Sequence, residues 1–368
     1  MMNQINMLSL LKNHKKILQI LPSFAEHDAV SNQVVSMNKV LEANGYKTKI
    51  YSNHFPKKYK GVIGEPKFLK ERQFDLAIYH HSIGDPVVDI VKHLSIPVLL
   101  YYHNITPPDY YAVYNQRIYE LLNQGLKQLD DLTGHVEVAI AASEFNSQQL
   151  SEFGFDNTKV LPIFFEPKRL NKITADHKTA SFLDNNNVTN ILFVGRFSPN
   201  KVHKDMIKAF YLYRKYYNSM ARLNLVGSYV EMNSYLAEIT ELIEALELES
   251  SVHVPGLVTD EEWKAYYENS DVFLSLSEHE GFFVPALEAN YFELPIIAYD
   301  AGAVASTAGG SAVLLDNKEP AIVAETIHKM VSDQKLRSDL IEKGRNNYVR
   351  FDADHLGPKL LEIVKQYV

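Results

Sequence analysis

The chain has 368 residues, of which 46% are hydrophobic and 22% charged, and its formal net charge at pH 7 is −8. This length exceeds what one ordinary hydrophobic core uses, so two domains are expected. The absence of cysteine excludes disulfides and cysteine-based metal clusters, and the longest apolar runs, such as Ile96–Tyr102, fall far short of the ~20 residues that a membrane-spanning helix needs.

Short apolar runs alternate with helical patterns over the first part of the chain. Strands are expected at 17–21, 49–51, 75–80, 97–102 and 136–142, and the last three are nearly continuous apolar runs, as in parallel strands that are buried on both faces. Helices are expected at 32–44 and 109–133, the first ended by Gly45. This alternation predicts a parallel sheet with helices on both faces.

A polar stretch at 166–187 is expected to connect two domains, and the pattern restarts after it. The expected strands of the second part are 190–195, 222–227, 252–255, 271–276 and 295–299. Its expected helices are 203–217, 231–248 and 319–332, with a last one at 354–367, and Thr259 and Glu262 fit a helix-capping box.

The chain is therefore predicted to be an α/β protein with two Rossmann-like, doubly wound parallel-sheet domains that face each other across a cleft. The predicted divisions are an N-terminal domain at 1–165, a connection at 166–187, a C-terminal domain at 188–345, and a C-terminal segment at 346–368 that packs back toward the first domain. Ligands of such sheets bind at the carboxyl ends of the strands, so the motifs at those ends indicate function.

Two cations follow the first expected strand of the second domain, in the run Phe193-Val-Gly-Arg-Phe-Ser-Pro-Asn-Lys201. Arg196 and Lys201 lie on one loop, where they can neutralise a diphosphate and stabilise it as a leaving group. The alternative is that both are ordinary surface cations.

Two glutamates, Glu280 and Glu288, flank the expected start of a helix after the strand at 271–276, with Gly281 and Pro285 between them. A helix that starts there offers free backbone N–H groups to an anion, and the glutamates add acceptors for hydroxyl groups. At ~100° per residue the two side chains differ by about 80° in direction, so they need not share one target. The alternatives are a helix start that favours acidic residues and a hydrolase pair, which usually comes from separate strands.

His103 and Asn104 follow the expected strand at 97–102 of the first domain, at the end where that strand meets the cleft. A hydrogen-bonded histidine that caps a loop is the alternative interpretation. No pair of histidines has convincing metal-ligand spacing, and no metal or cofactor is expected.

Taken together, these runs resemble the retaining glycosyltransferases of family four, which have the GT-B fold. Residues 194–201 are similar to the phosphate-binding segment of that family, and residues 277–288 to its signature of two glutamates with seven residues between them. The runs 102–108, 142–146, 160–163 and 299–304 resemble a bacterial branch that includes mannosyltransferases of surface-polysaccharide synthesis.

The resemblance implies a reaction on a nucleotide diphosphate sugar without a metal ion. Arg196 and Lys201 would hold the donor diphosphate, and His103 would orient the reacting sugar. Glu288 would accept hydrogen bonds from the ribose. The donor hexose would be held by Glu280 and by the N–H groups of Gly281, Phe282 and Phe283.

The loop at 21–32 departs from the family pattern, because relatives usually have glycines near His27 and Ser31. Asp28, Asn32 and, after the later strand, Asn104 remain as candidate substrate-binding residues. Relatives also often have Pro-Glu where this chain has Ala305-Ser306, a change without a physical explanation here.

Three functions follow as hypotheses. The first is a hexosyltransferase that uses a nucleotide diphosphate sugar, with GDP-mannose favoured, and acts on a glycan or lipid-linked acceptor. The second is a nucleotide-sugar 2-epimerase on the same fold, and the third is a non-catalytic subunit that binds nucleotide sugars.

The basic charge at the start of the chain suggests a partner. Residues 1–72 hold 12 basic and 5 acidic side chains, with clusters at Lys12/Lys15/Lys16 and Lys57/Lys58/Lys60. This pattern predicts either a solvated face or contact with an anionic membrane surface, and no nucleic-acid partner is expected. The positive charges interrupt the first apolar segment instead of preceding it, which is the wrong order for a secretory signal, so a cytoplasmic protein is expected. Contact with the inner face of the membrane is a separate hypothesis that rests on the basic charge of residues 1–72.

Overall fold

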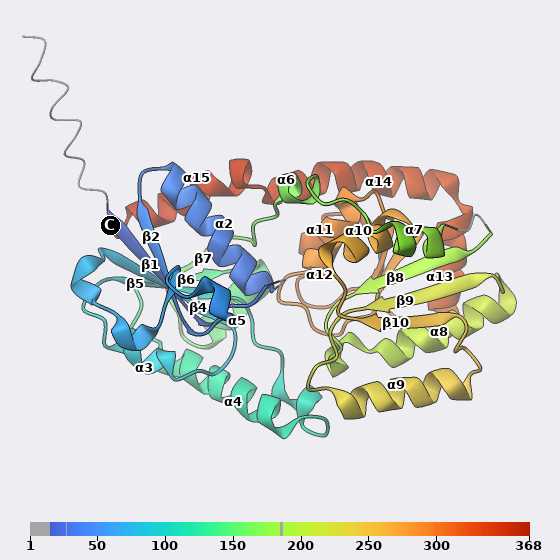
Figure 1. Cartoon of the computed structure of the whole chain (residues 1–368), viewed down its shortest axis with the longest axis horizontal. Helices are drawn as coiled ribbons and strands as arrows, with labels where there is room; N and C mark the ends of the chain where they lie inside the picture. Colours follow the sequence, from blue (N-terminus) through green and yellow to red (C-terminus); the bar gives the residue numbers. More distant parts are fainter. Residues whose placement is uncertain (1–14, 27, 185–186) are drawn as a thin grey trace, which may run out of the picture.

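The computed structural model describes residues 15–26, 28–184 and 187–368. Two parallel sheets lie beside each other, each covered by helices on both faces, and the last helices of the chain run along the edge that joins them (Figure 1). The prediction of two Rossmann-like domains is thereby confirmed.

The N-terminal sheet has seven parallel strands in the order β3-β2-β1-β4-β5-β6-β7. Its strands are β1 (Lys16–Ser23), β2 (Lys47–His54), β3 (Ile63–Gly64), β4 (Leu76–His81), β5 (Val98–Tyr102), β6 (Val138–Ala141) and β7 (Thr158–Val160). Every residue of β4, β5 and β6 is buried, as their continuous apolar sequences predict. Neighbouring residues of β1 face opposite cores, because Ile17 packs beneath one layer of helices and Leu18 beneath the other.

The helices of this domain within the described residues include α2 (Ala29–Ala43), α3 (Val87–Lys92), α4 (Gln116–Asp131) and α5 (Glu144–Glu152). Side-chain caps define where several of them begin, since Asp28 caps α2, Asn115 caps α4 and Ser143 caps α5. The cap at Asn115 divides the helix expected at 109–133 into a short 3-10 turn, η4 (Pro108–Tyr111), and α4.

The C-terminal sheet has six parallel strands in the order β10-β9-β8-β11-β12-β13. They are β8 (Thr189–Val194), β9 (Ala221–Val226), β10 (Val252–Gly256), β11 (Val272–Ser275), β12 (Ile296–Tyr299) and β13 (Ala312–Leu315). Its helices are α8 (His203–Tyr216), α9 (Asn233–Ala245), α10 (Asp260–Glu268), α11 (Val284–Tyr291), α12 (Val304–Ala308), α13 (Pro320–Ser332) and α14 (Gln334–Tyr348). The predicted capping box of Thr259 and Glu262 is present at the start of α10.

Two stretches of chain cross between the domains. The first carries the short helices α6 (Pro167–Leu170) and α7 (His177–Leu183), and the second is the turn η6 (Val349–Phe351) that leads from α14 into α15 (Ala353–Lys365). Helix α15 returns to the N-terminal domain and packs on α2, where Gly357 of α15 lies against Val40 of α2. Both crossings lie on the side of the molecule where α6, α14 and α15 are drawn in Figure 1. The residue bounds of the predicted domains stay a prediction.

Candidate active site

Loops from both domains meet at the carboxyl ends of the strands. The N-terminal domain contributes the loops after β5 and β6, and the C-terminal domain contributes the loops after β8, β11 and β12. The two lobes touch here directly, since the Ser143 hydroxyl donates to the Gly281 carbonyl at 2.8 Å.

The start of α11 presents unused backbone donors. The N–H groups of Gly281, Phe282 and Phe283 have no acceptor within the described part of the chain, and Pro285 occupies the first helical turn, where a missing N–H is harmless. The side chains of both phenylalanines point away from these groups, because Phe283 is buried in the domain core and Phe282 packs on a ring in η6. A cluster of free amides at a helix start is suited to an anion.

Glu280 is fixed by the neighbouring loop and by a cation. Its carboxylate accepts from Lys201 Nζ at 2.6 Å, and the Ala303 N–H donates to its carbonyl at 2.8 Å. Gly302 makes this approach possible, because it has a left-handed φ of 62° and a Cβ there would lie 2.4 Å from the Glu280 carbonyl oxygen. The Lys201–Glu280 pair is largely buried, with side-chain exposures of 18% and 9%.

Arg196, the other predicted phosphate ligand, has an exposed side chain without an ion pair to any described residue. It lies on the same loop after β8 as Lys201. The two cations therefore differ, since Lys201 is already neutralised by a carboxylate and Arg196 is free for an incoming anion.

Glu288 lies apart from Glu280 and has a different partner. The Tyr267 hydroxyl donates to Glu288 Oε2 at 2.7 Å. Burial raises the pKa of the Glu288 carboxyl to about 7, and the Tyr267 hydrogen bond and Arg169 only partly oppose this shift. The carboxyl group also lines a cavity of about 380 Å³ between the domains, and Glu280 does not.

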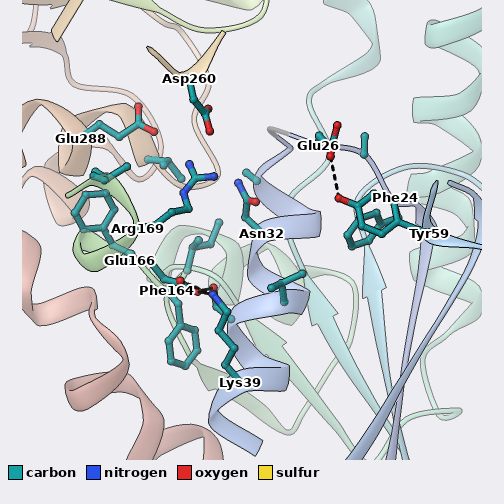
Figure 2. A pocket seen from close by; sticks show the side chains of 18 residues that line it. Phe24, Glu26, Asn32, Lys39, Tyr59, Phe164, Glu166, Arg169, Asp260 and Glu288 are labelled. Carbon is teal, nitrogen blue, oxygen red and sulfur yellow. Dashed lines mark hydrogen bonds and ion pairs between the residues drawn. The ribbon is translucent and has the colours of Figure 1, made fainter. Parts of the chain in front are cut away.

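Figure 2 shows this cavity. Helix α2 contributes Asn32 and Lys39, the C-terminal domain contributes Glu288 and Asp260, and Arg169 of α6 projects between them. Glu166 binds Lys39 through both carboxylate oxygens, at 2.9 and 2.6 Å, so part of the charge in the cavity is compensated. The cavity provides cationic, amide and carboxylate groups to a polar ligand that reaches Glu288.

His103 is held at the other side of the amide cluster by a second histidine. Its Nε2 lies 2.9 Å from His80 Nδ1, and its Nδ1 is buried without a partner among the described residues. Burial, reinforced by His80 and His81, holds the pKa of His103 well below its usual value, so the ring is neutral at physiological pH.

Asn104 serves as a contact between the two domains. Its Oδ1 accepts from His279 Nε2 at 2.6 Å, and its Nδ2 donates to Asn146 and Gln149 at 2.9 and 3.1 Å. Asn104 has a left-handed φ of 80°, and a Cβ on Gly281 would lie 2.2 Å from the Asn104 Cβ. Only glycine fits at position 281 while the domains are in this contact.

Asp28 caps α2 and Asn32 lies on its first turn. The Asp28 carboxylate accepts from the backbone N–H and the hydroxyl of Ser31, both at 2.9 Å, so it is engaged as a helix cap. Asn32 is exposed and lines the cavity. The departure noted at His27 lies outside the described residues.

Several residues of this region were not expected from the sequence. Arg169 and Asp260 line the cavity, while His279, Ser143 and His80 hold the loops. His279 directly precedes Glu280, the first glutamate of the signature, so its place in this loop is readable from the sequence. The others become visible only when strands and domains are assembled.

The structure leaves the predictions about metal and membrane open. Within the described ranges, no three His, Asp or Glu side chains are grouped to hold a metal ion, and metal independence stays a prediction. Likewise, none of the described helices is both long and apolar enough to traverse a bilayer. Lys12 lies outside the described residues, whereas Lys57, Lys58 and Lys60 are exposed.

Comparison with known proteins gives a family match. Residues 176–347, slightly less than half of the chain, match the model of the family "Glycosyl transferases group 1". The chain is 29% identical over 184 residues to D-inositol 3-phosphate glycosyltransferase of Salinispora arenicola, which is 48% of this chain and 41% of that protein. It is 25% identical over 209 residues to the capsular polysaccharide biosynthesis glycosyltransferase CapM of Staphylococcus aureus, covering 56% and 52%. The match thus spans about half the length of these relatives.

Solved structures resemble nearly the whole chain. Sucrose-phosphate synthase of Thermosynechococcus elongatus superposes with a TM-score of 0.74 at 15% identity, covering 96% of this chain and 99% of that one. Anabaena HepE, solved in complex with UDP and glucose, gives a TM-score of 0.73 at 18% identity, covering 96% and 100%. At such identities the likeness establishes the fold, which is GT-B. Residues 176–347 thus match the group 1 glycosyltransferase family model, within a chain whose fold is GT-B.

Proposed function

We propose that the protein transfers a hexose from a nucleotide diphosphate sugar to a glycan or lipid-linked acceptor in bacterial polysaccharide synthesis. The observation that carries the proposal is the set of free amides at the start of α11, next to the Lys201–Glu280 pair and opposite His103. Amides and cations suit a diphosphate leaving group, and the carboxylates and the histidine suit hydroxyl groups.

In this proposal the donor lies across the C-terminal domain. Its diphosphate binds the amides, Arg196 and Lys201, and its hexose contacts Glu280. Its ribose donates to Glu288, whose carboxyl lines the cavity of Figure 2. The raised pKa of Glu288 means that ribose binding is coupled to loss of a proton.

The reaction we propose retains the anomeric configuration and needs no metal. The acceptor hydroxyl attacks the anomeric carbon on the face from which the diphosphate departs. As the bond from that carbon to the phosphate oxygen breaks, this oxygen takes the hydroxyl proton. The helix start and the two cations stabilise the charge that develops on the leaving diphosphate.

GDP-mannose is our proposed donor, on the strength of the resemblance to bacterial mannosyltransferases. Because Anabaena HepE binds UDP and UDP-glucose, UDP-glucose is the first alternative to compare. A thermal-shift series of UDP-, GDP- and ADP-sugars tests both, since a ligand present at 100 times its Kd stabilises the folded state by ~2.7 kcal/mol. The proposal expects one nucleotide class to raise Tm and acceptor-dependent release of the nucleotide. If no nucleotide sugar raises Tm, the proposed function is wrong.

The epimerase alternative requires side-chain bases at the sugar. Asp28 is engaged as a helix cap, and burial holds the pKa of His103 well below its usual value, which weighs against both as general bases. Incubation of the donor alone in heavy water decides the matter: deuterium at C2 of the sugar supports epimerisation, and its absence together with acceptor-dependent release supports transfer. A binding subunit would bind donors without turnover over a broad set of acceptors.

We also propose that the protein acts at the cytoplasmic face of an anionic membrane. Around the exposed lysines 57, 58 and 60, the side chains of Val62 and Phe68 are 63% and 65% exposed, which is suited to the lipid interface. Cosedimentation with vesicles should require anionic lipid and weaken with salt. Equal binding to neutral vesicles would contradict this part of the proposal.

A further inference from the structure

A chain of three hydrogen-bonded side chains leads from β1 to the amide cluster. Gln19 lies on β1, His80 near the end of β4, and His103 just after β5. Gln19 Oε1 lies 2.7 Å from His80 Nε2, and His80 Nδ1 lies 2.9 Å from His103 Nε2. Gln19 and His80 are fully buried, so solvent does not supply alternative partners.

The orientation of the Gln19 amide follows from its other contacts. Its Nε2 donates to the Val34 carbonyl at 3.0 Å, and that carbonyl can only accept. Asn38 Oδ1 is a second acceptor for the same nitrogen. Gln19 Oε1 therefore faces His80 as an acceptor, and His80 Nε2 must carry the proton.

This assignment propagates along the chain. Burial lowers the pKa of His80 to about 3, so the ring is neutral and its Nδ1 has no proton. His80 Nδ1 then accepts from His103 Nε2–H. Because the His103 ring is also neutral, its Nδ1 is an unprotonated acceptor, and this is the atom that is buried without a partner among the described residues.

We infer that Gln19 and His80 are positioning residues that hold His103 in one tautomer, with Nδ1 as an acceptor for a hydroxyl group of the donor sugar. The identity of the ligand rests on the proposed function, whereas the tautomer does not. His103 borders the amide cluster, since its carbonyl lies 3.2 Å from the place of a Cβ on Gly281. A hexose beside the diphosphate brings hydroxyl donors to this position, and an acceptor there would fix the sugar ring.

The tautomer is measurable in the free protein. In ¹⁵N-histidine-labelled protein, long-range couplings between ring nitrogens and carbon-bound protons distinguish the tautomers, and the signals that His103→Gln removes assign the residue. We expect a proton on Nε2 and none on Nδ1, unchanged between pH 6 and 8. A proton on Nδ1 in the free protein would overturn the inference, whatever the activity.

Two substitutions of His80 form a matched pair. In His80→Asn the amide oxygen can occupy the place of Nδ1 and accept from His103, whereas in His80→Gln the amide reaches toward Gln19 and leaves His103 without its acceptor. Both replace the same buried ring with a side-chain amide, so similar losses of stability are expected. The His103 tautomer should persist in His80→Asn and become mixed in His80→Gln.

The catalytic readout separates the sugar from the nucleotide. We expect kcat/KM for the nucleotide sugar to fall about tenfold in His80→Gln, with a much smaller loss in His80→Asn, while the Kd of the free nucleoside diphosphate stays unchanged in both. Equal losses in the two variants, or a parallel loss of nucleoside diphosphate affinity, would overturn the inference. A wild-type protein that binds no nucleotide at all would instead refute the proposed function and leave the tautomer measurement standing.

Discussion

Replacing Glu288 by glutamine should stabilise the protein increasingly as pH rises. Burial raises the pKa of this carboxyl from 4.5 to about 7. A raised pKa contributes stability that is complete below the unfolded-state pKa and is lost as pH rises through the folded-state pKa. The native state of the wild type therefore loses stability between about pH 4.5 and pH 7, and Glu288→Gln has no such loss.

The magnitude follows from the shift. About 2.5 pH units at about 1.4 kcal/mol per unit gives an upper bound of about 3.5 kcal/mol. Because Glu288 is half-buried, solvent screening reduces the expected loss of stability to about 1–2 kcal/mol. Any change in the hydrogen bond from Tyr267 adds an offset that does not vary with pH.

Trp263 provides the assay. It is the single tryptophan of the chain, and its ring lies 4.8 Å from that of Tyr267. Denaturant unfolding followed by Trp263 fluorescence gives the free energy of unfolding of each protein at pH 5 and at pH 8. The free energy of Glu288→Gln minus that of wild type should grow by about 1–2 kcal/mol from pH 5 to pH 8. Glu293→Gln is the control, because the Arg345 hydrogen bond lowers the pKa of Glu293 and predicts no such growth over this range. A difference for Glu288→Gln that is constant or shrinks with pH would refute the reasoning.

Three further outcomes are expected. Arg196→Ala and Lys201→Ala should each lower kcat, measured by nucleotide release, to an extent that corresponds to a loss of roughly 2–4 kcal/mol of transition-state stabilisation. Only Lys201→Ala should also lower Tm, because it leaves a buried carboxylate unpaired. Wild-type turnover in both variants would contradict the leaving-group role. Gly281→Ala should weaken donor binding at least tenfold in calorimetry, because its Cβ would lie 2.2 Å from a side-chain carbon of the other domain. Gly357→Ala on α15 is the control and should bind the donor normally, because its Cβ would lie 3.4 Å from the nearest atom. Equal donor affinities in the two variants would count against the close contact. Donor affinity should fall as pH drops below about 7 and lose that dependence in Glu288→Gln; an unchanged pH profile would argue against the ribose contact.

The sequence predicts the sheets well because parallel strands buried on both faces are nearly continuous apolar runs. It misses β13 and α14 for the opposite reason. Strand β13 has four residues at the edge of its sheet, and α14 carries many charged side chains with few buried positions. The helix expected from Glu231 begins at Asn233, since Glu231 has a left-handed φ of 64°.

The site divides in the same way. The start of α11 and its two glutamates are local in sequence, and the strand, turn and proline that define them can be read directly. The partner of Lys201 cannot, because the two residues of the pair are 79 positions apart. The same holds for the contact of Asn104 with His279 and for the histidine chain behind His103, which depend on how strands and domains are assembled.

The central claim is that free amides and two cations of the C-terminal domain bind the diphosphate of an activated sugar. A crystal structure of the protein with a nucleotide diphosphate sugar tests it most directly. We predict the diphosphate at the N–H groups of residues 281–283, within reach of Arg196 and Lys201. A diphosphate bound elsewhere, for instance wholly within the cavity between α2 and α6, would contradict the claim.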